Sequence, residues 1–139
     1  MSELVRFSVA MPDELLVQFD NLVARRGLAK NRSEVVRDLV REALVDEEWD
    51  DPAQEIVGTL TIVFSHHGSD LQAKLDQVQH AYHHEIISSM HVHLDAHNCL
   101  EVIVLKGKSE DVRSIADSIL GVKGVKHGRL TATTTGRFL

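Results

Sequence analysis

Cysteine, proline and long apolar runs are all scarce in this chain of 139 residues. The single cysteine, Cys99, cannot form an internal disulfide, so we expect it to be a small buried hydrophobe, a nucleophile or a metal ligand. No run of about eighteen apolar residues is present, which argues against a membrane span. The first residues also lack the basic, apolar and small-residue order of a signal peptide. We therefore expect a cytoplasmic protein without a membrane partner.

Charge is unevenly distributed along the chain, although the net charge of −6 argues against indiscriminate coating of nucleic acid. Residues 1–41 carry seven basic and six acidic side chains, residues 42–55 carry seven acids and no base, and the remainder carries eight of each. The acidic segment also contains Pro52, one of only two prolines. This pattern predicts three parts, which are a domain of residues 1–46, an acidic linker of residues 47–55 and a second domain of residues 56–139.

The first domain is predicted to begin with a strand. Apolar side chains alternate with Arg6, Ser8 and Ala10, which is the period of two that is typical of a strand. Pro12 is then a favourable first residue for a helix, whose apolar side chains recur at a spacing of three to four. Gly27 supplies a C-terminal stop for this helix.

A second helix is predicted to follow the first. Asn31 can accept a hydrogen bond from the amide three residues further on while Glu34 reaches back, which is a capping box. One strand and two helices in about 45 residues bury too small a core to be stable alone. We therefore expect an intertwined dimer, in which two copies pair their strands antiparallel and form a ribbon that fits the major groove of DNA.

The strand, the first helix and the motif NRSEVVRDLVREAL together resemble the ribbon-helix-helix family of bacterial repressors. The resemblance implies that Arg6, Ser8 and Ala10 face base edges. A guanidinium can bond guanine bidentately and a hydroxyl can serve several bases, whereas Ala10 offers only a methyl contact. The alternative is that Arg6 and Ser8 lie on a solvated edge strand. The start of the second helix is expected to bind backbone phosphate, with the side chains Arg32, Ser33 and Arg37.

The second domain is predicted to have the order βαββαβ. The expected strands cover about residues 56–64, 89–95, 99–106 and 124–134, and the expected helices about 70–88 and 109–120. This is the ferredoxin-like order, which small ligand-binding regulatory domains called ACT domains also have. The fold class is therefore α+β, a βαα ribbon-helix-helix domain followed by an ACT-like domain, and the fold alone leaves the function open.

Three potential metal ligands share one face of the predicted hairpin. His91 and His93 are two residues apart on a strand and therefore project from the same side. The next strand places Cys99 on that side if Val102 and Val104 face the core. Imidazole and thiolate suit zinc, nickel or copper, whereas calcium and magnesium prefer oxygen ligands.

A fourth ligand is expected from the helix at residues 70–88. His80 lies ~200° from Val78 of the apolar stripe at ~100° per residue, so it points away from the core of its own domain. If this helix covers the face opposite to Cys99, His80 can join only the ligands of another subunit. The remaining histidines are interpreted as surface residues: His66, His67, His83, His84, His97 and His127.

The spacing H-V-H-x5-C, with a histidine eleven residues upstream, resembles the nickel site of the NikR family of nickel-responsive regulators. The resemblance extends over nearly the entire chain. It implies one Ni(II) per subunit in square-planar geometry, held by His91, His93 and Cys99 of one subunit and His80 of a neighbour. It also implies a homotetramer that is a dimer of dimers.

Further residues are expected to support the bound metal or a second ion. Gln79 and Glu101 are candidates to orient the nickel ligands through hydrogen bonds, or are ordinary solvent-facing residues. Glu34 and Asp38 match positions that in relatives help to bind a second cation, often K⁺, and their alternative role is helix-surface charge. The loop Gly68–Ser69 lacks the basic residues with which relatives can contact DNA.

These patterns predict a repressor that binds a palindromic DNA operator when it holds Ni(II) and that controls nickel-uptake genes. The alternative is a ribbon-helix-helix regulator that senses another transition metal, or a small molecule such as an amino acid. A metalloenzyme is disfavoured because four protein ligands leave no position for a reactive water, so we expect no enzymatic activity. An antitoxin would need a disordered tail, whereas the second domain is well patterned.

Overall fold

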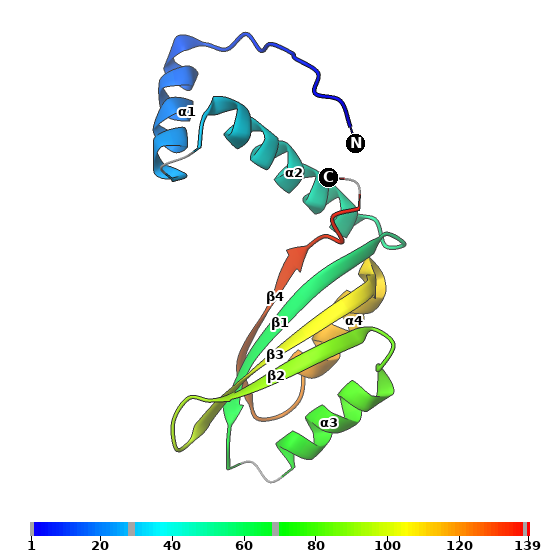
Figure 1. Ribbon diagram of the computed structural model, residues 1–139. Helices are drawn as coiled ribbons and strands as arrows, with labels where there is room; N and C mark the ends of the chain where they lie inside the picture. The colour runs from blue at the N-terminus through cyan, green and yellow to red at the C-terminus, as the bar shows by residue number, and fades with distance from the viewer. Residues whose placement is uncertain (1, 28–29, 68–69, 138) are drawn as a thin grey trace. The chain divides into compact units, whose positions relative to one another are not determined.

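The computed structural model describes residues 2–27, 30–67, 70–137 and 139 (Figure 1). The chain forms two compact units, Met1–Glu42 and Ala43–Leu139. Within the described residues, no helix combines the length and the apolar character needed to cross a membrane.

The first helix of the N-terminal unit, α1 (Asp13–Arg25), has the predicted ends. It begins directly after Pro12, whose fixed φ suits the start of a helix. It ends two residues before Gly27, which has a φ of 125°. This positive φ is available to glycine without the steric penalty that a Cβ atom would bring.

The second helix, α2 (Arg32–Asp50), starts at the predicted cap and extends further than expected. The backbone N–H of Glu34 donates to Asn31 Oδ1 at 3.0 Å, which satisfies one of the free amides at the start of the helix. At its other end the helix includes residues 47–50 of the predicted linker. The bounds of the linker therefore stay a prediction, and only residues 51–54 of it lie outside helix and strand.

Residues 2–11 form no strand in the single chain. The side chains of Val5, Phe7 and Val9 are 84%, 74% and 65% exposed. A strand requires a partner for its backbone N–H and C=O groups, and the described part of this chain supplies none for this segment. The strand at residues 5–11 therefore stays a prediction that depends on a second copy.

The second unit has the predicted βαββαβ order (Figure 1). An antiparallel sheet has the strand order β2-β3-β1-β4, as in the ferredoxin-like arrangement. Helix α3 is shorter than predicted. The elements are β1 (Glu55–Ser65), α3 (Leu71–Ala81), β2 (Ile86–His93), β3 (Asn98–Lys108), α4 (Ser109–Leu120) and β4 (Val125–Thr133).

The core of the second unit lies between the helices α3 and α4 and one face of the sheet. On β3 the buried side chains are those of Cys99, Glu101, Ile103 and Leu105, whereas the residues between them are partly exposed. The prediction that Val102 and Val104 face the core was therefore wrong. Both faces of β3 are apolar, so alternation alone could not identify the covered face.

The end of α2 is part of the core of the second unit. Trp49 is 5% exposed, and its indole N–H donates to the carbonyl oxygen of Thr133 at 2.7 Å. The carbonyl oxygen of Trp49 accepts from Ser109 Oγ at 2.7 Å and from Arg113 Nη2 at 3.2 Å. These contacts fix the last turn of α2 against α4 and β4.

Candidate metal centre

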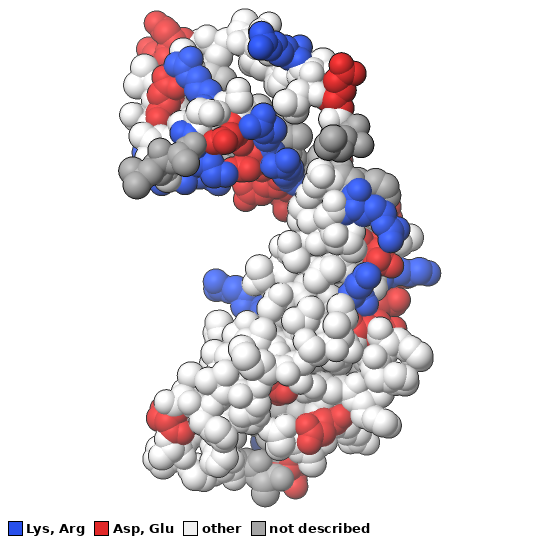
Figure 2. Space-filling model, in the orientation of Figure 1, with Lys and Arg blue, Asp and Glu red and all other residues white. Residues whose placement is uncertain are grey.

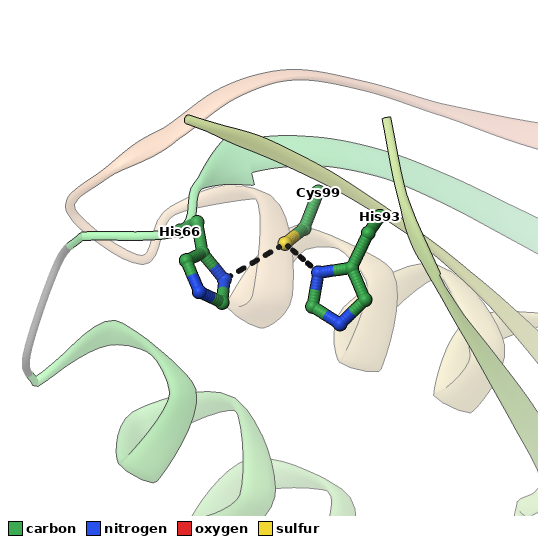
Figure 3. Close-up of side chains that lie close together, drawn as sticks. All are labelled: His66, His93 and Cys99. Carbon is green, nitrogen blue, oxygen red and sulfur yellow. Dashed lines mark hydrogen bonds between the residues drawn. The ribbon is translucent and has the colours of Figure 1, made fainter. Parts of the chain in front are cut away.

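A buried thiol faces two imidazoles at one end of the sheet (Figure 3). Cys99 has no exposed surface, and its Sγ lies 3.3 Å from His66 Nδ1 and 3.5 Å from His93 Nδ1. One ligand atom from each of the three residues lies within 4.8 Å of the others. A single metal ion could therefore contact all three after small side-chain movements.

Strand register brings these residues together. His93 pairs with Cys99 across β2 and β3, and Phe64 pairs with Cys99 across β1 and β3. His66 follows two residues after Phe64, and its backbone N–H donates to the carbonyl oxygen of His97 at 2.7 Å. This hydrogen bond continues the pairing with the hairpin past the end of β1, so His66 stays beside the hairpin.

From the sequence, His66 was interpreted as a surface residue, and its contact with Cys99 was not expected. The residue is exposed, yet its ring contacts the buried sulfur. The signal was present in the alternation of β1, because Ile62 and Phe64 are buried on the covered face and position 66 continues that series. The wrong assignment of the covered face of β3 hid this relation.

His91 adjoins the group without belonging to it. Its ring centroid is 4.9 Å from that of His93, and its ring makes an edge contact with Phe64 at 5.6 Å. These three residues also line a cavity of about 380 Å³, together with Ser65, His66 and Gln72. His91 can therefore reach an ion in this cavity if its ring rotates.

His80 of the same chain lies apart from this group. It is exposed near the end of α3, whereas Gln72 near the start of α3 lines the cavity. Eight residues of helix separate the two by about 12 Å along the axis. The premise that α3 covers the face opposite to Cys99 was wrong, because Leu75 of α3 and Cys99 belong to the same core. The part of His80 in metal binding stays a prediction.

Gln79 and Glu101 form a hydrogen bond beside the candidate ligands. Gln79 Nε2 donates to Glu101 Oε1 at 3.1 Å, and Glu101 is 4% exposed. The other carboxylate oxygen, Oε2, is buried and has no hydrogen-bond partner among the described residues. A buried acceptor without a donor costs free energy. Oε2 is therefore available to accept a hydrogen bond from the N–H of an imidazole whose ring has turned.

This donor set fits a transition metal of the nickel, copper and zinc group. Two imidazole nitrogens and a sulfur are borderline-soft ligands, whereas calcium and magnesium prefer oxygens. The spare oxygen of Glu101 is the kind of acceptor that orients a metal-bound imidazole. The residues present therefore suit nickel.

In the N-terminal unit, two residues with predicted roles are engaged in ion pairs. Arg32 donates from Nε and Nη2 to the two carboxylate oxygens of Asp20, both at 2.8 Å, and this hydrogen bonding lowers the pKa of Asp20. Asp38 accepts from Lys30 Nζ at 2.9 Å, and this hydrogen bond lowers its pKa. Each residue must break or share these contacts to bind phosphate or a cation.

The other predicted DNA-contacting residues are accessible. Arg6, Ser8 and Ala10 are exposed in the N-terminal segment, and Ser33 and Arg37 are exposed on α2. Basic and acidic side chains are interspersed over the N-terminal unit, whereas the face of the second unit in this view is mostly uncharged (Figure 2). Gly68 and Ser69 lie outside the described residues.

Comparison with known proteins identifies the family. Residues 57–133 match the family described as "NikR C terminal nickel binding domain", and residues 5–47 match "Ribbon-helix-helix protein, copG family". Over all 139 residues the chain is 55% identical to a protein of Pelobacter propionicus and 57% identical to one of Geobacter sp. (strain M21). Each comparison covers 99% of the relative, and both relatives are described as "Putative nickel-responsive regulator". The chain belongs to the NikR family of nickel-responsive regulators.

Membership in the NikR family confirms several predictions. The fold is α+β with a ribbon-helix-helix part and a NikR nickel-binding domain, and the protein is a nickel-sensing transcription regulator rather than an enzyme. A solved chain from Thermotoga maritima, titled as an uncharacterized protein, is 13% identical over 58% of this chain and 98% of its own, with a TM-score of 0.48. The assignment to the NikR family does not depend on that likeness.

Proposed function

We propose that this NikR-family protein is a repressor that binds a palindromic DNA operator when it holds Ni(II), and that it controls nickel-uptake genes. The observation that carries the proposal is the buried Cys99 sulfur facing His66 and His93 at one end of the sheet. Nickel would be held by His91, His93 and Cys99 of one subunit and His80 of a neighbour, one ion per subunit. Bound nickel would supply a positive centre that holds these side chains in one arrangement.

The fourth ligand has two candidates. His66 already lies 3.3 Å from the sulfur, whereas His80 must come from another copy. Comparison of His66→Gln with His80→Gln separates them by nickel affinity and oligomeric state. If His80 is the ligand, His80→Gln weakens nickel binding and the nickel-dependent assembly together, while His66→Gln leaves the assembly unchanged. The opposite pattern would assign the position to His66.

Exposed apolar side chains on and beside β2 support assembly into a homotetramer. Ile87 and Met90 on β2 and Leu94 after it are 57%, 58% and 51% exposed. Solvent-exposed apolar groups of this size favour an interface between copies. Sedimentation of the full chain with nickel is expected to give four subunits, and a monomer at micromolar concentration would contradict this assembly.

DNA binding is proposed for the paired N-terminal segments. Arg6, Ser8 and Ala10 would contact bases, and the start of α2 would contact phosphates. The apolar residues of the same segment are exposed in the single chain, and packing against a second copy would bury them. A second cation such as K⁺ at Glu34 and Asp38 would have to compete with Lys30 for Asp38.

Nickel can control DNA binding only if it binds better to the arrangement of subunits that fits the operator. Direct titration of the full chain with Ni(II), followed by DNA binding of the same sample, tests this. Cys99→Ser should lose both the tight nickel binding and the nickel-dependent part of DNA affinity. His127→Gln, a change of an exposed histidine on β4, serves as the control. Equal DNA affinity with nickel and with chelator would contradict the proposal.

A further inference from the structure

Two histidines outside the candidate metal centre lie in direct contact. Nε2 of His67 and Nδ1 of His97 are 2.9 Å apart, and the ring centroids are separated by 5.0 Å. Both side chains are exposed. The consecutive residues His66 and His67 therefore serve different contacts, the first with the buried sulfur and the second with His97.

The backbone holds this pair in place. The N–H of His97 donates to Asp95 Oδ1 at 2.7 Å, and the carbonyl oxygen of His97 accepts from the N–H of His66 at 2.7 Å. The N–H of His67 donates to Ser65 Oγ at 3.4 Å. These hydrogen bonds connect the end of β1 to the turn between β2 and β3. The two rings are therefore already held close together, and a ligand that binds both has little conformational freedom to remove.

We propose that His67 and His97 form a second, separate site for a divalent cation of the nickel, copper and zinc group. Two nitrogens on adjacent coordination positions at about 2.1 Å from a metal are about 3 Å apart, close to the spacing of this pair. In the neutral pair, one imidazole N–H lies between the two rings. When the metal binds, this proton moves to the other nitrogen of the same ring, so both imidazoles stay neutral.

The chemistry of this site differs from that at Cys99. It has two nitrogen donors and no sulfur, and because both rings are exposed, water completes the coordination. Asp95 places a negative charge beside His97, partly offset by Lys126, whose ammonium donates to Asn98. We expect weaker binding than at the buried thiol, so the site fills at higher nickel concentration. It goes beyond the proposed function and does not require it.

Calorimetric titration of the full-length protein with nickel chloride alone tests the site. The wild type is expected to show a tight class and a weaker class of binding. The double variant His67→Gln/His97→Gln should weaken the second class about tenfold or more, because neither of the two imidazole donors remains. Cys99→Ser should lose the tight class and keep the weaker one, and His127→Gln should keep both.

Three results would overturn this site. The first is a wild type that shows the tight class alone. The second is a weaker class that is unchanged in the double variant. The third is a double variant that loses the tight class together with the weaker one. A different result would separate the two proposals. If the wild type lacks the tight class but has a weaker class that depends on His67 and His97, the proposed function is contradicted and this second site is supported.

Discussion

Replacement of Trp49 by smaller side chains measures how much the end of α2 contributes to the second unit. The indole is 5% exposed, so truncation to alanine should lower the free energy of unfolding by about 3–5 kcal/mol. Trp49→Phe keeps much of the apolar contact and loses the hydrogen bond to Thr133. Because Thr133 is exposed, water can replace that donor, and we expect a total loss of about 1–3 kcal/mol.

Gly58 on β1 provides a sharper test of the same packing. A Cβ atom at this position would lie 3.0 Å from Trp49 Cη2, 3.1 Å from Leu130 Cδ1 and 3.3 Å from Val112 Cγ1. Gly58→Ala should therefore cost about 1–3 kcal/mol through overpacking, reduced by about 0.4–1 kcal/mol because the unfolded chain loses freedom. In the Trp49→Phe background the atom at 3.0 Å is gone, so the same change should cost less.

The four proteins of this cycle can be compared by urea unfolding in chelator, followed by far-UV circular dichroism. We expect a favourable coupling of at least about 0.5 kcal/mol between Gly58→Ala and Trp49→Phe. Gly107→Ala on β3 is the matched control, because its Cβ would meet only ordinary contacts from 3.4 Å outwards. Additive effects of Gly58→Ala and Trp49→Phe, within about 0.3 kcal/mol, would refute the packing described here.

Three further predictions concern the N-terminal unit. Arg6→Ala should lower the preference for operator over unrelated DNA by about 1–3 kcal/mol with nickel affinity intact, and loss of nickel binding instead would mean that the domains are misassigned. Phe7→Ser should weaken DNA binding by disrupting the paired strands, measured on the nickel-loaded protein; unchanged affinity would place Phe7 outside the ribbon. Asp20→Asn should remove an acid-sensitive contribution to stability. The pKa of Asp20 is lowered from 3.8 by Arg32, so the ion pair stabilises the folded state above that value and is lost as pH falls through the lower folded-state pKa. The gap in melting temperature between the wild type and this variant should therefore narrow from pH 5 to about pH 2.

Local signals in the sequence predicted both ends of α1, the start of α2 and the order of elements. Pro12, Gly27 and Asn31 act through backbone geometry or a nearby hydrogen bond, so their effect is readable without knowledge of the rest of the chain. The strand at residues 5–11 differs because its hydrogen-bond partners are expected in a second copy. No local pattern can show whether that copy is present.

The covered face of β3 could not be read from alternation. Val102 and Val104 are as apolar as Ile103 and Leu105, and only the packing of α3 and α4 decides which set is buried. This error placed Cys99 on the uncovered face, so the distant His66 was not recognised as its neighbour. The pair His91 and His93 was recognised because a spacing of two on one strand is a local property.

The burial of Cys99 has a chemical consequence for the chain. A thiol without exposed surface reacts slowly with oxidants and alkylating reagents, because these must first reach the sulfur. The only cysteine of the molecule is therefore shielded from disulfide cross-links between copies and from overoxidation to sulfonic acid. A regulator built this way should keep its sulfur intact in cells exposed to peroxide.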